Sequence, residues 1–134
     1  MRPETQTWLK IAREDLAAAE LLLQKGIYRM VCLHCQQAVE KISKALLTER
    51  EVDFKRTHNI VDLLSLLSAQ GLALNVNHEE AGFLNAVYRS RYPAEAGLLP
   101  HGEPTADDAG KALALARRVV AQGQTLLEQR GLRT

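Results

Sequence analysis

Polar side chains interrupt the apolar pattern of one long stretch, Tyr28 to Leu47, and they are the residues whose types could carry chemistry inside a core. Apolar residues recur there at steps of three and four, which predicts one broad buried face of a helix. Gln37, Glu40 and Lys41 lie among them. Such groups need partners where other helices cover them, because burying them unpaired costs free energy. The stretch is therefore predicted to combine a helical core with a supporting polar cluster.

Asp15 raises the same question of a partner, since it lies in the buried-looking part of an earlier helix. An ionised carboxylate inside a bundle needs a cation or several donors. Lys41 and Lys44 are the natural candidates, which places Asp15 in the polar cluster. The alternative is a solvent-facing residue in the charged run 13–15, and the sequence leaves both open.

Two cysteines, Cys32 and Cys35, are spaced as CxxC. A redox pair of the thioredoxin type needs a βαβ context. A structural zinc site has four protein ligands, and the chain contains no second CxxC. His34 lies between the cysteines but points to another face of the helix. We expect two ordinary core residues, no metal site and no cofactor.

Histidines and a basic, aromatic segment supply the remaining candidates. His58 falls at the start of a predicted helix, where it either bonds a neighbouring backbone group and supports the polar core, or acts as a base or ligand. A later helix begins apolar and ends in the segment YRSRYP, and its aromatic and basic residues are Tyr88, Arg89, Arg91 and Tyr92. The loop that follows, 94–104, contains His101. Loops at helix ends commonly carry function.

Five predicted helices position these residues. They cover residues 3–24, 28 to 49 or 50, 57–71, 75 or 77 to 92, and 105–130. Gly26 is expected to end the first helix in the left-handed conformation, and Gly71 is expected to end the third helix. Thr57, Asn75 or Asn77, and Thr105 are expected to cap the third, fourth and fifth helices. The link between the first two helices is short, which predicts an antiparallel hairpin.

Composition sets the class of protein. The chain has 134 residues, of which 46% are hydrophobic and only 4% aromatic, with a net charge of +1. We therefore expect a single all-α domain over residues 1–134, with a core of small and aliphatic side chains. No apolar run is long enough to span a membrane, and the first residues lack the apolar segment of a signal peptide. A cytoplasmic protein is expected.

The order of these segments resembles the HEPN domain family (higher eukaryotes and prokaryotes nucleotide-binding domain). The segments are WLKIAREDLAAAELLL, CQQAVEKISKALL, a TH helix start, YRSRYP and a closing Ala-rich helix. The resemblance implies an up-and-down four-helix bundle with an additional short helix, and homodimerisation. It also implies nucleotide or RNA association, and a minimal nucleotidyltransferase as partner, as in some toxin–antitoxin pairs.

One branch of that family consists of metal-independent ribonucleases, which carry an Arg followed after four to six residues by a His. Arg91 matches the Arg, but nine residues separate it from His101. In such a site the imidazole is the base and the guanidinium stabilises the phosphate. Alternatively, Arg91 pairs with Asp15 or Glu40 and is structural.

Three functions follow from these observations. The first is a non-catalytic module that associates with nucleotide or RNA through Tyr88, Arg89, Arg91 and Tyr92, as a homodimer. The second is an endoribonuclease that uses Arg91 and His101. The third is a purely structural helical oligomer.

Overall fold

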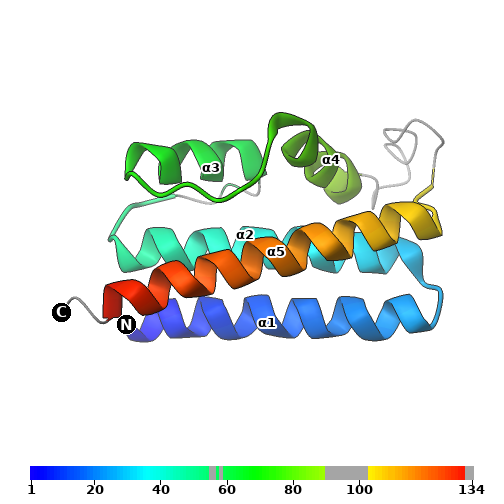
Figure 1. The fold of residues 1–134 in the computed structure, drawn as a ribbon, viewed down its shortest axis with the longest axis horizontal. Helices are drawn as coiled ribbons and strands as arrows, with labels where there is room; N and C mark the ends of the chain where they lie inside the picture. Colours follow the sequence, from blue (N-terminus) through cyan, green and yellow to red (C-terminus); the bar gives the residue numbers. More distant parts are fainter. Residues whose placement is uncertain (55–56, 58, 90–102, 132–134) are drawn as a thin grey trace.

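The computed structural model describes residues 1–54, 57, 59–89 and 103–131, and the side chains of residues 88–89 and 130–131 fall outside that description. Within these ranges the chain is all-helical, which confirms the expected fold class (Figure 1). The five helices are α1 (Pro3–Gln24), α2 (Tyr28–Glu49), α3 (Ile60–Ala69), α4 (His78–Arg89) and α5 (Ala106–Gly131). The shortest of them, α3, is the additional helix of the predicted bundle.

The central element is α2, which contacts each of the other four helices. The long helices α1 and α5 lie alongside it, while α3 and α4 pack on another side of it (Figure 1). Both cysteines are fully buried, and so are the other predicted apolar positions of α2, namely Val31, Ala38, Val39, Ile42, Ala45 and Leu46. This burial confirms that the 28–47 stretch is the middle of the core.

Left-handed residues end three of the helices, and two of them are the glycines predicted at helix ends. Gly26 and Gly71 have φ of +73° and +72°. After each of them, the next backbone N–H donates to a carbonyl five residues earlier, from Ile27 to Leu22 and from Leu72 to Leu67. Glu51 takes the same position after α2, with φ of 57°. A side chain has a steric cost in this left-handed conformation, which a glycine at the same position would avoid.

Reciprocal side-chain caps begin α4 and α5. Asn77 Oδ1 accepts from the Glu80 N–H at 2.8 Å, and Glu80 Oε1 accepts from the Asn77 N–H at 3.0 Å. Thr105 and Asp108 form the same pair of bonds. The caps at residues 77 and 105 are therefore confirmed.

The expected cap of the third helix is wrong by two residues. The helix begins at Ile60, and Asn59 is its N-cap, with Oδ1 accepting from the Val61 N–H at 2.9 Å. The Thr57 hydroxyl instead accepts from the Asn59 N–H and so supports the preceding turn. Thr and Asn both have the short oxygen-bearing side chain that caps use, so composition did not separate the two positions.

We expect Glu80→Gln to remove part of the acid sensitivity of folding. The N–H of Asn77 and the Arg118 guanidinium stabilise the carboxylate, which lowers the pKa of Glu80 from the usual 4.5. A lowered pKa means that the carboxylate contributes stability above about pH 4.5, and that this contribution is lost as pH falls through the folded-state pKa. Urea denaturation between about pH 6 and about pH 3 measures this. The gap between wild type and variant should shrink with acid, and a gap independent of pH would contradict the assignment.

Candidate functional site

Charged groups of the central helix form the cluster that the sequence predicted. Glu40 is fully buried, and the Lys44 side chain is only 6% exposed. Lys44 Nζ lies 2.6 Å from Glu40 Oε1, and Lys41 Nζ lies 3.6 Å from Glu40 Oε2. Two ammonium groups therefore share one carboxylate inside the bundle.

Two aromatic rings complete the surroundings of the buried lysine. Lys44 Nζ lies 5.5 Å from the ring centroid of Trp8 and 5.4 Å from that of Phe54. The two rings meet edge to face, with centroids 6.0 Å apart. Ring faces attract a cation, and they also exclude water from it. The residues from α1 and from the segment after α2 thus fix the ammonium group next to Glu40.

Amide side chains extend the cluster toward the surface. Lys41 Nζ donates to Gln37 Oε1 at 2.7 Å, and Gln37 Nε2 donates to Gln36 Oε1 at 2.8 Å. Gln36 is fully buried, whereas the Lys41 side chain is 15% exposed. Gln37, Glu40 and Lys41 are therefore brought together as expected. Of the two lysines in this set, Lys41 has the more exposed side chain, at 15% against 6% for Lys44.

Asp15 does not join this cluster, which corrects the partner expected from the sequence. Its Oδ1 lies 2.9 Å from Nδ1 of His34, and the two side chains are 16% and 28% exposed. Lys41 and Lys44 instead pair with Glu40. Of the two alternatives that the sequence left open for Asp15, the paired one is observed, but both proposed partners were wrong.

The register of the α1–α2 hairpin explains the difference. In an antiparallel pair, residues at similar distances from the link face one another. His34 lies at the level of Asp15, while Lys44 lies at the level of Trp8. Lys44 is ten residues beyond His34 along α2, or about 15 Å at the rise of an α-helix. His34 therefore faces Asp15. In the sequence, its place between two cysteines indicated only a possible metal ligand.

We expect Asp15 and His34 to be coupled by about 0.5–1.5 kcal/mol in the free energy of unfolding, because one partly buried hydrogen bond joins the two helices. The double-mutant cycle uses Asp15→Ala, His34→Ala and the combined variant. The matched control is the Glu20–Arg117 pair, whose side chains are 42% and 56% exposed. Its coupling should be smaller, about 0–0.5 kcal/mol. Equal couplings would place the Asp15–His34 contact among the surface pairs.

The two cysteines are core residues, as predicted. Both are fully buried and neither forms a disulfide. Burial raises the pKa of each thiol to about 12. The reactive and metal-binding form of cysteine is the thiolate, so these side chains remain in the unreactive form near neutral pH.

Several sequence candidates lie outside what the structure describes. Arg91, Tyr92, His101 and His58 belong to the undescribed positions, and Tyr88 and Arg89 are placed only as backbone in the last turn of α4. The pairing of Arg91 with His101, and its alternative with Asp15 or Glu40, thus remain predictions. The roles given to Tyr88, Arg89, Tyr92 and His58 remain predictions as well.

The described ranges contain neither a group of possible metal ligands nor a membrane-spanning helix. No three His, Cys, Asp or Glu side chains there converge as metal ligands would. No helix among those residues has the length and apolar character needed to cross a bilayer.

An all-α bundle with a charged, aromatic-lined cluster in its central helix defines the class of this protein. The sequence model described as HEPN domain matches residues 5–125. The chain therefore belongs to the HEPN domain family, as the resemblance of its segments predicted. No curated protein has a significant sequence match to it.

Solved structures with the same fold support this assignment. The archaeal HEPN homologue ST0689 has a TM-score of 0.67 at 23% identity, over 94% of this chain and 98% of that one. The protein TT1696 from Thermus thermophilus has a TM-score of 0.68 at 24% identity, over 92% and 98%. The HEPN domain protein TM0613 from Thermotoga maritima has a TM-score of 0.67 at 20% identity, over 91% and 98%. At these identities the likeness establishes the fold.

Proposed function

We propose that this HEPN domain protein is a nucleotide- or RNA-associated module that acts as a homodimer beside a minimal nucleotidyltransferase. Its role is to bind, and it does not cleave RNA through Arg91 and His101. Membership in the family supplies the frame for this proposal. The charged cluster of α2 supplies the chemistry.

The observation that carries the proposal is the balance of charge in that cluster. Lys41 and Lys44 together carry two positive charges, and the carboxylate that they share, Glu40, carries one negative charge. Excess positive charge in a partly desolvated site favours an anion. Lys41, whose ammonium group is held by Gln37, has the more exposed side chain of the two lysines and is the proposed contact for a phosphate group.

The end of α4 supplies the second part of the proposed surface. Tyr88 and Arg89 end this helix, and Arg91 and Tyr92 follow in the sequence. Aromatic rings stack on bases, and guanidinium groups bind phosphate through paired donors. Because α4 packs on α2, the two elements can contribute to one ligand.

Exposed apolar side chains support the proposed homodimer. Leu21, Ile27 and Met30 are 63%, 45% and 38% exposed, and they lie around the short link between α1 and α2. Burial of such side chains in a symmetric contact is favourable. Light scattering after size exclusion should give twice the chain mass, and Met30→Glu should shift it toward the monomer. An unchanged monomer mass for the wild type would contradict this part.

A minimal nucleotidyltransferase is the proposed protein partner, on the grounds of the family resemblance, and a toxin–antitoxin pair is the setting that this implies. Co-expression of the chain with a nucleotidyltransferase encoded beside it is the direct measurement. Recovery of a stoichiometric complex supports the partnership. Separate elution of the two proteins would remove it from the proposal and leave ligand binding to be tested alone.

Titration with ATP and with a short single-stranded RNA tests ligand binding. The wild type should bind, and Lys41→Gln should weaken binding and lower the dependence of affinity on salt, by a slope of about 0.7 for a lost phosphate contact. Lys10→Gln, at an exposed position of α1, is the matched control and should change neither. No affinity at about millimolar ligand would favour the purely structural alternative.

A further inference from the structure

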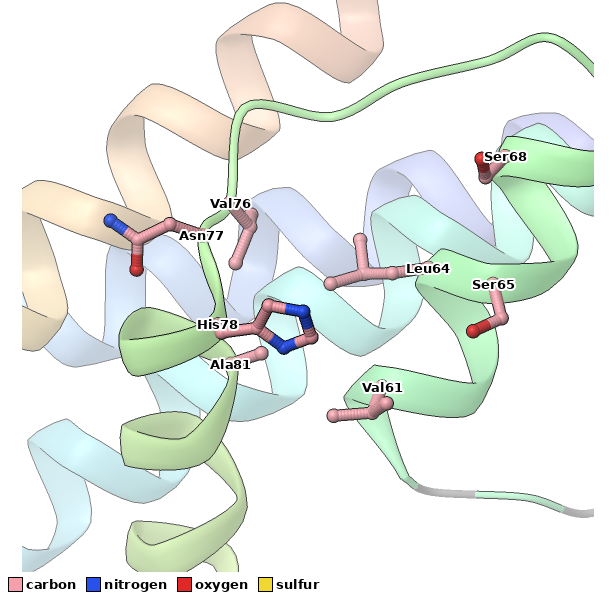
Figure 2. A pocket seen from close by; sticks show the side chains of 8 residues that line it. All are labelled: Val61, Leu64, Ser65, Ser68, Val76, Asn77, His78 and Ala81. Carbon is pink, nitrogen blue, oxygen red and sulfur yellow. The ribbon is translucent and has the colours of Figure 1, made fainter.

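A pocket of about 330 Å³ lies between α3 and the start of α4, apart from the charged cluster (Figure 2). One wall is a single face of α3. The other wall is the first turn of α4 together with the segment that precedes it. The His78 ring projects from the first residue of α4 across the pocket toward α3 (Figure 2). The lining residues are Val61, Leu64, Ser65, Ser68, Val76, Asn77, His78 and Ala81.

Side chains of α5 hold the α4 wall of this pocket in place. Gln122 accepts from the Asn75 N–H at 2.6 Å and donates to the Ala73 carbonyl at 3.1 Å. Arg118 donates to the Asn75 carbonyl at 2.9 Å and to Glu80 at 2.8 Å. The segment that precedes α4 is therefore fastened to the longest helix of the fold.

Asn85 fixes the distance between the two walls. From the second turn of α4, its Oδ1 accepts from the Ile60 N–H, and its Nδ2 donates to Asn59 Oδ1, both at 3.2 Å. These bonds tie the start of α3 to α4. The pocket is thus formed before any ligand arrives, which lowers the ordering cost of binding.

Polar groups of the lining are available to a ligand. Neither the hydroxyls of Ser65 and Ser68 nor the ring nitrogens of His78 form a hydrogen bond within the described part of the chain. Asn77 is different, because its side chain caps α4. No Asp, Glu, Lys or Arg lines the pocket. The lining thus offers donors, acceptors and apolar surface, but no formal charge.

We propose that this pocket binds an uncharged, flat heteroaromatic ring, namely a nucleobase. Val61 and Leu64 supply apolar surface for the faces of a ring. Hydroxyls both donate and accept, which suits the mixed edge of a base. The His78 imidazole can stack on a base or bond to its edge. The volume is at the small end of ligand pockets, which begin at about 300 Å³.

The choice of a nucleobase rests on the proposed nucleotide association, whereas the choice of an uncharged ring rests on the lining alone. No cationic side chain lines this pocket to pair with a phosphate group. The place of that group is the lysine cluster of α2. The two sites therefore differ in the part of a nucleotide that they recognise, and the two can be tested separately.

Amide chemical shifts of the full-length protein, titrated with adenosine, guanosine, cytidine and uridine, test the pocket without any phosphate. At least one nucleoside should shift amides of α3 and the start of α4, while ribose 5-phosphate should not shift them. His78→Ala should weaken this binding about tenfold, in line with the loss of one stacking contact. Ser68→Tyr, at an exposed position of α3, should fill the pocket and abolish binding.

Glu79→Ala is the matched control for His78→Ala, since Glu79 is the exposed neighbour of His78 on α4 and does not line the pocket. It should leave nucleoside binding unchanged. The proposal is overturned if no nucleoside shifts these amides, if ribose 5-phosphate shifts them equally, or if both pocket variants bind as the wild type does. Such a result leaves RNA binding at the lysine cluster intact. If the wild type binds no RNA but nucleosides still shift these amides, the proposed function is overturned instead.

Discussion

Glu40→Ala is expected to lower the free energy of unfolding by about 3–5 kcal/mol, because it leaves buried cations without their shared carboxylate. Glu40 is fully buried, and the Lys44 side chain is 6% exposed. The rings of Trp8 and Phe54 keep water from the Lys44 ammonium group. Urea unfolding followed by circular dichroism measures the change.

A double substitution separates loss of charge balance from loss of packing. Glu40→Leu with Lys44→Met removes both charges and keeps the approximate volume, so it should restore most of the stability lost in Glu40→Ala. Glu14→Ala, at an exposed position of α1, is the control and should stay within about 0.5 kcal/mol of wild type. A Glu40→Ala protein as stable as the control would contradict the prediction. It would mean that the Lys44 ammonium group becomes hydrated when its partner is absent.

The contrast between this cluster and Asp15 shows where sequence reasoning is strong. Periodicity placed Glu40 and Lys41 in the central helix. Residues four apart on a helix meet whatever the tertiary structure, so the Glu40–Lys44 pair was within reach of spacing alone, although Lys44 was expected to pair with Asp15. The partner of Asp15 depends on the axial register between α1 and α2. Helical periodicity carries no information on that register, so His34 was missed.

The pocket was missed for a different reason. Val61, Ser65 and Ser68 belong to the more exposed side of α3, and His78 begins the next helix. Nothing in either segment alone marks a cavity. It arises because Asn85 and Arg118 set the placement of α4, through contacts between residues 25 to 43 positions apart in the chain. Short-range patterns do not report such contacts. The caps at Asn77 and Thr105, in contrast, could be predicted because both partners of each cap lie within four residues of sequence.

Gly123→Ala is expected to destabilise the protein by about 1–3 kcal/mol, although alanine favours helices. A Cβ at Gly123 would lie 2.3 Å from Cγ1 of Ile42, a fully buried residue of α2. Such a contact forces either the side chain of Ile42 or the two helix axes to move. The helix that approaches α5 at this position is α2.

Gly110→Ala, on the same helix, makes the test specific. A Cβ at Gly110 meets nothing within 4 Å, so this substitution should raise stability by up to about 1 kcal/mol through helix propensity alone. Opposite signs for the same substitution on one helix would identify the approach of α5 to α2 as the cause. If Gly123→Ala also stabilised the fold, Ile42 would have to reorient at little cost. In that case Gly123→Ala and Ile42→Ala, which removes Cγ1, should be additive in a double-mutant cycle, whereas a clash predicts that the combined variant is more stable than the sum of the two single changes.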